Sequence, residues 1–212
     1  IVAGLTAANA LVGSPFHRDD LLQLATDIEG HPDNVAPAIY GGFTVNTVTN
    51  GHVECFSFLP RIFMRFVVMV PDFYLSTKSA REVLPTEVSM RDAVFNISHA
   101  AMMVAALARG SEKHLKNAFT DALHQNYRAS LIPGMFDVFA AAKKAGAYGA
   151  ALSGAGPCLI AFVPAHRKCT EEVAAAMQDA FRAHEIEARP LHLRLDTKGA
   201  RVLRRRDMNA KR

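Results

Sequence analysis

The sequence lacks a strong excess of charge of either sign, which argues against a nucleic-acid-binding protein. Its 24 Lys and Arg residues and 20 Asp and Glu residues leave a formal net charge of only +4. The basic residues are dispersed along the chain until the run Arg204, Arg205 and Arg206. A balance this mild predicts no nucleic-acid partner.

The sequence also lacks an uninterrupted hydrophobic run. The longest uncharged stretch is 145–165, and a membrane span needs ~20 apolar residues. This stretch contains several Gly and Pro residues, which predict strand, loop and strand instead of a spanning helix. No basic start followed by an apolar core and a small-residue cleavage site is visible. We therefore expect neither a membrane protein nor a secretory leader.

Cysteine is scarce, and several familiar catalytic motifs are absent. The three cysteines, Cys55, Cys158 and Cys169, are odd in number and have no metal-ligand spacing. They favour free thiols in a reducing, cytoplasmic setting. The chain has no G-x-x-x-x-G-K-[ST], H-E-x-x-H, C-x-x-C or G-x-S-x-G pattern. These absences argue against a P-loop, a zinc protease, a dithiol redox site and an α/β-hydrolase.

The patterns that are present predict a mixed fold of class α+β in two lobes. Apolar spacing predicts helices over 1–12, 19–29, 35–40, 77–84, 89–110, 111–123, 135–146 and 170–181. Short strands are expected over 43–49, 52–58, 66–70, 148–152, 158–163 and 191–195, and Asn50-Gly51 predicts a hairpin between the first two. A change of composition at Pro60-Arg61 divides the chain into lobes of 1–60 and 61–212.

Polar residues cluster at the predicted turn after the second helix. Glu29, His31, Asp33 and Asn34 lie within six positions. Mg²⁺ prefers hard oxygen ligands, and Glu29 at a helix end could supply one. The alternative is structural: Asp33 would cap the next helix and Glu29 would be a solvated surface acid.

Two further groups pair a basic side chain with a polar neighbour. Thr77 and Arg81 are four residues apart, so a helix places a hydroxyl and a guanidinium on one face, which suits a carboxylate or a phosphate. His124 and Arg128 have the same spacing after an apolar stripe. The alternatives are a helix cap with a surface arginine, and a polar helix end where arginine complements the helix dipole.

A glycine-containing loop lies between the predicted strands 148–152 and 158–163. Its sequence is Ser153-Gly154-Ala155-Gly156-Pro157. Glycines there allow backbone N–H groups to approach a ligand. An ordinary hairpin loop is the alternative, and a G-x-G pattern does not separate the two by itself.

Taken in order, these four groups resemble a known family. The string Glu29-Gly30-His31-Pro32-Asp33-Asn34-Val35-Ala36-Pro37, followed by Gly41-Gly42, resembles the homoserine kinase family of the GHMP kinase superfamily. The similarity continues through Ser76-Thr77-x-x-Ala80-Arg81-x-x-Leu84-Pro85, His124-x-x-Tyr127-Arg128 and Ser153–Pro157, so it covers the whole chain.

The resemblance implies a fold, an activity and partners. The fold would be the two-lobed GHMP kinase fold, with the remainder of a lobe like ribosomal S5 domain 2 followed by a ferredoxin-like lobe and the active site between them. The activity would be transfer of the γ-phosphoryl group of ATP to the side-chain hydroxyl of L-homoserine, in threonine biosynthesis. ATP and Mg²⁺ would be the cofactors, and a homodimer is one candidate assembly.

The resemblance also assigns roles to individual residues. Glu29 matches the Mg²⁺-binding glutamate, and Asn34 matches the residue that orients the attacking hydroxyl. The substrate pocket would further contain His31, Asp33 and Thr77, and the arginine pair Arg81 and Arg128 would hold the amino-acid carboxylate. The loop formed by Ser153, Gly154, Ala155 and Gly156 would support the phosphate site.

One departure from the family pattern affects the expected activity. The family's phosphate loop, Pro-x-x-x-Gly-Leu-Gly-Ser-Ser-Ala, would end immediately before Ile1, so we expect residues 1–212 alone to be inactive. Two alternatives stay open. One is another small-molecule kinase of the superfamily, and the other is a non-catalytic ligand-binding remnant.

Overall fold

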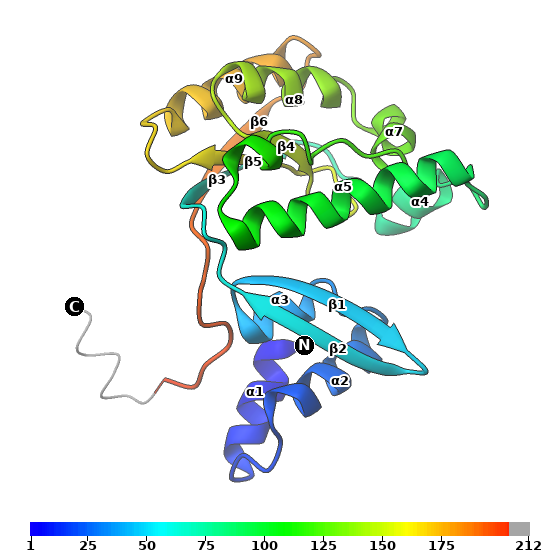
Figure 1. Ribbon diagram of the computed structural model, residues 1–212, viewed down its shortest axis with the longest axis vertical. Coiled ribbons are helices and arrows are strands. Elements are labelled where there is room, and N and C mark those ends of the chain that lie inside the picture. Colours follow the sequence, from blue (N-terminus) through cyan, green and yellow to red (C-terminus); the bar gives the residue numbers. More distant parts are fainter. Residues whose placement is uncertain (204–212) are drawn as a thin grey trace. The chain divides into compact units, whose positions relative to one another are not determined.

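The chain folds into two compact units (Figure 1). The structure is a computed structural model that describes residues 1–203. The first unit contains Ile1–Pro60 together with the segment that follows residue 194, and the second unit is Arg61–Arg194. Both units mix helices and strands, which confirms the predicted α+β class.

The first unit packs three helices beside a two-stranded hairpin. The helices are α1 (Val2–Leu11), α2 (Arg18–Glu29) and α3 (Val35–Tyr40). Strands β1 (Phe43–Thr49) and β2 (His52–Phe58) pair antiparallel around Asn50 and Gly51, which both have positive φ. The Asn-Gly signal therefore predicted this turn correctly. The buried core of the unit comprises Leu21, Leu22, Ala25, Val35, Ala36 and Ile39.

The second unit has the connectivity of a ferredoxin-like fold. Strands β3 (Met64–Pro71), β4 (Gly149–Leu152), β5 (Leu159–Pro164) and β6 (Ala188–Leu193) form one antiparallel sheet in the order β4-β5-β3-β6. The long connection from β3 to β4 contains α4 (Thr77–Glu82), α5 (Met90–Arg109), α6 (Glu112–Leu115), α7 (Gln125–Arg128), a 3₁₀ turn (Ala129–Leu131) and α8 (Met135–Lys144). Helix α9 (Thr170–Arg182) connects β5 to β6.

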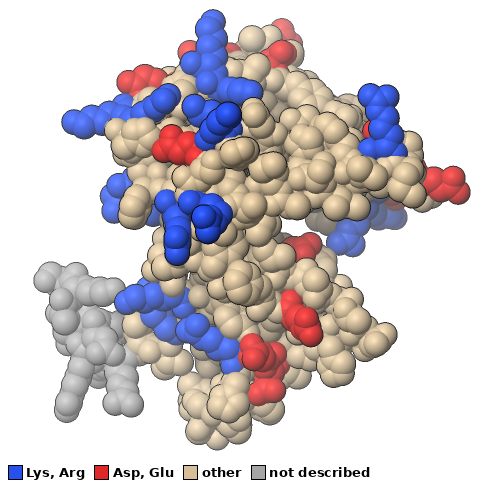
Figure 2. All heavy atoms as spheres, in the orientation of Figure 1, with Lys and Arg blue, Asp and Glu red and all other residues tan. Residues whose placement is uncertain are grey.

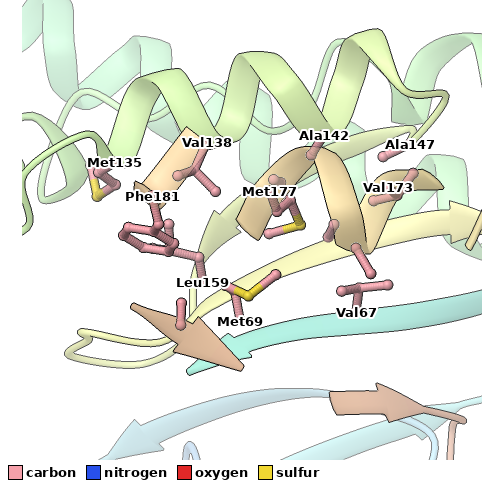
Figure 3. Packing of buried hydrophobic residues seen from close by; sticks show 14 of the residues in the cluster. Val67, Met69, Met135, Val138, Ala142, Ala147, Leu159, Val173, Met177 and Phe181 are labelled. Atoms are coloured by element: carbon pink, nitrogen blue, oxygen red, sulfur yellow. The ribbon is translucent and has the colours of Figure 1, made fainter. Parts of the chain in front are cut away.

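The core of the second unit lies between the sheet and the helices α8 and α9 (Figure 3). Val67 and Met69 alternate along β3 and are fully buried, as a strand with one buried face requires. Val138 from α8 and Met177 and Phe181 from α9 face them across the core. The core fixes both ends of β4 and β5, whose connecting loop carries the glycines discussed above.

Two expected helices differ from the structure. The stripe over 111–123 predicted one helix, but α6 ends at Leu115, and residues 116–124 form a turn, bends and irregular backbone. His124 and Arg128 consequently lie at the start and end of the separate one-turn helix α7 instead of closing a long one. The sequence Thr170-Glu171-Glu172 predicts that Thr170 caps the helix over 170–181, but the cap position is Cys169 and Thr170 is the first residue of α9.

The segment after β6 belongs with the first unit, whereas the prediction placed all of 61–212 in the second lobe. Hydrogen bonds explain the difference: the N–H of Gly42 donates to the carbonyl of Asp196 at 2.7 Å, and the N–H of Ala200 donates to the carbonyl of Ile39 at 3.2 Å. Asp196 also accepts from the N–H groups of Lys198 and Gly199. The first two hydrogen bonds join backbone groups that are far apart in the sequence, so no local sequence pattern could predict them.

The surface carries charges of both signs. Figure 2 shows Lys and Arg side chains interspersed with Asp and Glu on the visible face, separated by wide areas without charge. The basic run at 204–206 lies outside the described residues. Within residues 1–203, no helix has the length and hydropathy needed to cross a membrane.

The close approach of Gly199 to α3 provides a test of how the C-terminal segment packs. A Cβ at Gly199 would lie 2.2 Å from the carbonyl oxygen of Ile39, whereas one at Gly51 would meet nothing within 4 Å. Both glycines have positive φ, so Gly51→Ala is a matched control for backbone strain. We expect Gly199→Ala to lower the free energy of unfolding by about 1–3 kcal/mol more than Gly51→Ala, measured by urea denaturation. Equal losses would contradict this packing.

Candidate active site

The turn between α2 and α3 carries the four polar residues predicted in the first unit. Glu29 is the last residue of α2, and Gly30 ends the helix in the left-handed conformation with φ 90°. Glu29, Asp33 and Asn34 are exposed, while the neighbouring Pro32 and Val35 are buried and anchor the turn. The sequence thus places several polar side chains on a short segment that is fixed at both ends.

The end of α2 is electronegative, which suits a cation. Asp27 and Glu29 lie in its last turn, which contains no basic residue. Helix C-termini carry a partial negative charge, so a carboxylate there is unfavourable unless a cation is nearby. Within residues 1–203 there is no group of three or more His, Cys, Asp or Glu side chains that could hold a metal ion. One carboxylate still fits Mg²⁺, which takes one or two carboxylates and fills its shell with water and substrate phosphates.

The side chains of Asp33 and Asn34 are not used to cap α3. The N-cap residue is Asn34, not Asp33, and its side chain makes no capping hydrogen bond. The alternative that Asp33 caps this helix is therefore wrong. His31 lies beside Asp33, with Nδ1 3.9 Å from the Asp33 carboxylate. That nitrogen is buried and has no hydrogen-bond partner among the described residues, so the turn offers polar atoms to a ligand.

Helix α4 presents Thr77 and Arg81 on one exposed face. Ser76, not Thr77, is the cap: its hydroxyl accepts from the N–H of Ser79 at 3.0 Å. Thr77 is then the first helical residue, and its exposed hydroxyl is not used for capping. Arg81 lies one turn later and is also exposed. The predicted juxtaposition of hydroxyl and guanidinium is thus compatible with the helix.

Arg128 on α7 brings three predicted elements of the second unit together. Its Nε donates to the carbonyl of Ala80 at 2.9 Å, next to Arg81. Its Nη1 lies 3.5 Å from the carbonyl of Gly154 and 3.3 Å from Nδ1 of His124. Helix α4, helix α7 and the loop Ser153–Gly156 therefore meet around the guanidinium of Arg128. Its third nitrogen, Nη2, lies on the remaining edge of the group.

Two guanidinium groups close together indicate a site for an anion. Burial lowers the pKa of Arg128 from its usual value, and the positive charge of Arg81 lowers it further, against the opposing effect of Asp121. The bond of Arg128 to the carbonyl of Ala80 places it beside the turn that carries Arg81, and none of the ion pairs among residues 1–203 involves Arg81. A carboxylate or phosphate between such groups removes their repulsion and accepts several charge-assisted hydrogen bonds.

His124 is held neutral near this pair. Burial lowers its pKa, Asp121 works in the opposite direction, and the charge of Arg128 lowers it further. The Nη1 of Arg128 can only donate, so Nδ1 of His124 is assigned as the acceptor and Nε2 as the protonated nitrogen. Nε2 lies 3.5 Å from the carboxylate of Asp121. The imidazole therefore adds no positive charge to the two arginines.

The loop between β4 and β5 is a hairpin loop with an open apex. The N–H of Ser153 donates to the carbonyl of Cys158 at 2.8 Å and closes it. Gly156 has φ 93°, a conformation that favours glycine, and a Cβ there would lie 2.9 Å from the end of the Ile132 side chain. Gly154 has nothing within 4 Å of its Cβ position. Among residues 1–203, the N–H groups of Gly154 and Ala155 find no hydrogen-bond acceptor, which leaves two consecutive donors for an anion.

The sequence prediction missed the residues that fix α7. Asp121 accepts from the N–H groups of His124 and Gln125 at 2.8 and 2.6 Å, and from the side chain of Asn96 at 3.0 Å. Burial alone would raise the pKa of Asp121, but these hydrogen bonds hold it below its usual value. An Asp three residues before a helical turn is a capping signal. It was hidden because the stripe over 111–123 predicted a helix through this position.

Comparison with protein families matches both units. The GHMP kinases N-terminal domain matches residues 1–42, and the GHMP kinases C-terminal domain matches residues 103–186. Homoserine kinase of Desulfitobacterium hafniense is 44% identical over 203 residues, covering 96% of this chain and 68% of the relative. Homoserine kinase of Microchaete diplosiphon is 46% identical, covering 96% and 66%. The chain thus spans about two thirds of the length of these curated relatives.

Solved structures give the same picture. The crystal structure of homoserine kinase from Cytophaga hutchinsonii superimposes with a TM-score of 0.88 at 29% identity, covering 95% of this chain and 65% of that one. A mevalonate kinase from L. major superimposes with a TM-score of 0.67 at 17% identity, covering 95% and 65%, which shows a shared fold. The two-lobed fold expected from the sequence is confirmed.

The carboxylate of Asp121 makes a pH-dependent contribution to stability. Its pKa is depressed in the folded state, so the contribution is complete above the unfolded value of about 3.9 and is lost as pH falls through the folded value. Asp121→Asn turns an NH₂ group toward one of the three donors. We expect this variant to have a free energy of unfolding about 1.5–3 kcal/mol lower than wild type at pH 7, measured by thermal unfolding. Below about pH 4 this difference should shrink. A difference that does not change with pH would contradict this role.

Proposed function

Because the chain belongs to the homoserine kinase family of the GHMP kinases, we propose that it binds L-homoserine through Arg81 and Arg128 and positions the hydroxyl for phosphorylation. The family's reaction is ATP-dependent phosphorylation of homoserine, a step of threonine biosynthesis. The observation that carries the residue assignment is the hydrogen bond from Nε of Arg128 to the carbonyl of Ala80 at 2.9 Å, which places this guanidinium beside the helical turn that carries Arg81. Homoserine offers its carboxylate as the anion for these two groups.

The proposed grip uses the part of Arg128 that the protein leaves available. Nε donates to the carbonyl of Ala80, and Nη1 lies 3.5 Å from the carbonyl oxygen of Gly154. Nη2 and the exposed guanidinium of Arg81 then bind the carboxylate oxygens, with Thr77 beside them. Arginine suits this role because its planar fork matches a carboxylate in geometry as well as in charge.

The polar turn of the first unit supplies the groups for the reacting hydroxyl. Asn34 is exposed and its side chain does not cap α3, so its amide can hydrogen-bond and orient the hydroxyl, and His31 and Asp33 of the same turn would contact the substrate beside it. An amide cannot take up a proton at neutral pH, so the proton passes to a phosphate oxygen instead of a protein base. Positioning carries most of the catalysis, as phosphoryl transfer requires little covalent assistance.

Glu29 and the glycine loop are proposed to serve the phosphates. Glu29 would hold Mg²⁺, which neutralises phosphate charge when bound. The N–H groups of Gly154 and Ala155, between Ser153 and Gly156, would donate to phosphate oxygens. The cytoplasmic location and the homodimer expected from the sequence stay predictions.

Replacement of either arginine by lysine tests the substrate. Lysine keeps the charge but loses the fork. In the full-length protein, Arg81→Lys or Arg128→Lys should reduce kcat/KM for homoserine by roughly 10- to 150-fold, equivalent to about 1.5–3 kcal/mol, with little change in the KM for ATP. Steady-state kinetics with each substrate varied would measure this.

Two controls separate this assignment from a general loss of function. 3-Aminopropan-1-ol lacks the carboxylate, so it should be a poor substrate that the arginine replacements impair hardly at all. Arg182→Lys alters an arginine of the same unit that pairs with Asp179 at 3.2 Å, and it should leave the kinetics unchanged. If both alcohols suffer equally, the arginines act on phosphate or on folding, and homoserine loses its support as the substrate.

Replacement of Glu29 by glutamine tests the cation site. Glu29→Gln keeps the size of the side chain and removes its charge. We expect kcat in the full-length protein to fall on the order of 10²-fold, with partial recovery at high Mg²⁺, because one charged ligand is lost. Asp27→Asn is the matched control, since it removes a charge from the same last turn of α2. A kcat that is unchanged across the Mg²⁺ titration would make Glu29 a simple helix-end acid.

A further inference from the structure

We propose that Gln125 is a positioning residue that holds Arg128 and the Ser153–Gly156 loop in the arrangement needed for the reaction. This inference rests on the proposed function, because it assigns to Gln125 an effect on the grip of the substrate carboxylate. Its support comes from burial, hydrogen bonds and topology within the second unit.

Gln125 is exceptionally buried for a polar residue. It is 5% exposed, and among residues 1–203 only Thr26, at 7%, is another buried polar side chain. Its Oε1 accepts from the N–H of Leu152 at 2.8 Å, and its Nε2 points to the carbonyl of Phe119 at 3.4 Å. A buried amide is retained only where both of its ends find partners, and here they do.

The bond to Leu152 fixes the start of the glycine loop. Strand β4 is at the edge of the sheet, so an outward-facing N–H on it has no neighbouring strand to pair with. Leu152 is the last residue of β4, and its N–H is satisfied by Gln125. Ser153 follows immediately and closes the loop through its bond to Cys158. Gln125 therefore determines where the loop leaves the sheet.

The same helical turn fixes Arg128. Gln125 and Arg128 are the first and last residues of α7, whose N–H groups are held by Asp121. Arg128 in turn contacts the carbonyls of Ala80 and Gly154. A shift of α7 would therefore move the guanidinium relative to Arg81 and to the loop at the same time.

Packing alone does not hold this turn. Two solvent-open pockets of about 230 Å³ and 190 Å³ are each lined by Gln125, Phe119 and Asp121, on the α8 side and the α5 side respectively, so the turn is not enclosed by packed side chains. Where apolar packing is incomplete, directional hydrogen bonds decide the position of an element. The amide of Gln125 is the bond that connects α7 to the sheet.

The test compares Gln125→Met with Gln178→Met in the full-length protein. Gln178 is the matched control, because its side chain also joins a helix to a strand of this unit, through the carbonyl of Ala188 at 2.7 Å on β6. We expect Gln125→Met to lower kcat/KM for homoserine about 10- to 100-fold, the scale expected for misplaced binding groups. Gln178→Met should lower the melting temperature comparably and change kcat/KM less than about twofold.

A double mutant shows whether Gln125 acts through Arg128. If it does, adding Gln125→Met to Arg128→Lys should lower kcat/KM for homoserine by less than about threefold, because the guanidinium that Gln125 positions is already lost. Full additivity, or a lower melting temperature with unchanged kcat/KM, would overturn the inference. If Arg128→Lys alone leaves homoserine use intact, the proposed function fails instead.

Gln125→Glu keeps the inference falsifiable if the methionine variant does not fold. Its carboxyl oxygen still accepts from the N–H of Leu152, while the donor to Phe119 is weakened or lost. We expect this variant to recover most of the homoserine kcat/KM that Gln125→Met loses, to within about fivefold of wild type. A folded Gln125→Glu protein with the larger loss would contradict a role carried by the bond to Leu152.

Discussion

The carboxylate of Asp121 holds a single helical turn in place, and the functional groups of the second unit depend on that turn. Helix α7 has four residues, too few to be stable without tertiary contacts. Asp121 satisfies the N–H groups of His124 and Gln125, and Asn96 from α5 orients the carboxylate. Gln125 and Arg128 then connect the turn to β4, α4 and the glycine loop. Burial of the carboxylate is offset by three donors, and for this reason it stays charged.

The charges around this turn fit the proposed binding of a carboxylate. His124 is neutral, and Arg128 uses Nε on a backbone carbonyl while Arg81 remains exposed. An arginine pair used only for structure would be expected to have an acidic partner. In the first unit the local charge has the opposite sign, because the last turn of α2 contains Asp27 and Glu29 and no basic residue. The proposed carboxylate site therefore belongs to the second unit, and the proposed cation site belongs to the first.

Asn34 makes the proposed chemistry one of positioning. Because Asn34, the residue proposed to orient the hydroxyl, cannot act as a base, the proposed reaction would depend on how well the substrate is held and how well phosphate charge is neutralised. Small displacements of the binding groups would then lower the rate, and this is the physical reason for the proposed positioning role of the buried amide of Gln125.

Most of the helices and strands, the α+β class and the positions of the motifs follow from the sequence alone. The Asn50-Gly51 hairpin, the capped helix from Ser89 and the alternating strand β3 follow from local backbone preference and burial period, which neighbouring residues encode. Tertiary structure decided the rest. Helix α7 exists because Asp121 and Asn96, 25 residues apart, meet; Arg128 reaches the carbonyl of Ala80 from 48 residues away; and residues after 194 return to α3 through backbone hydrogen bonds. Such hydrogen bonds join residues that are far apart in the sequence and are not related by a helix or strand repeat. Only folding of the chain brings these residues together.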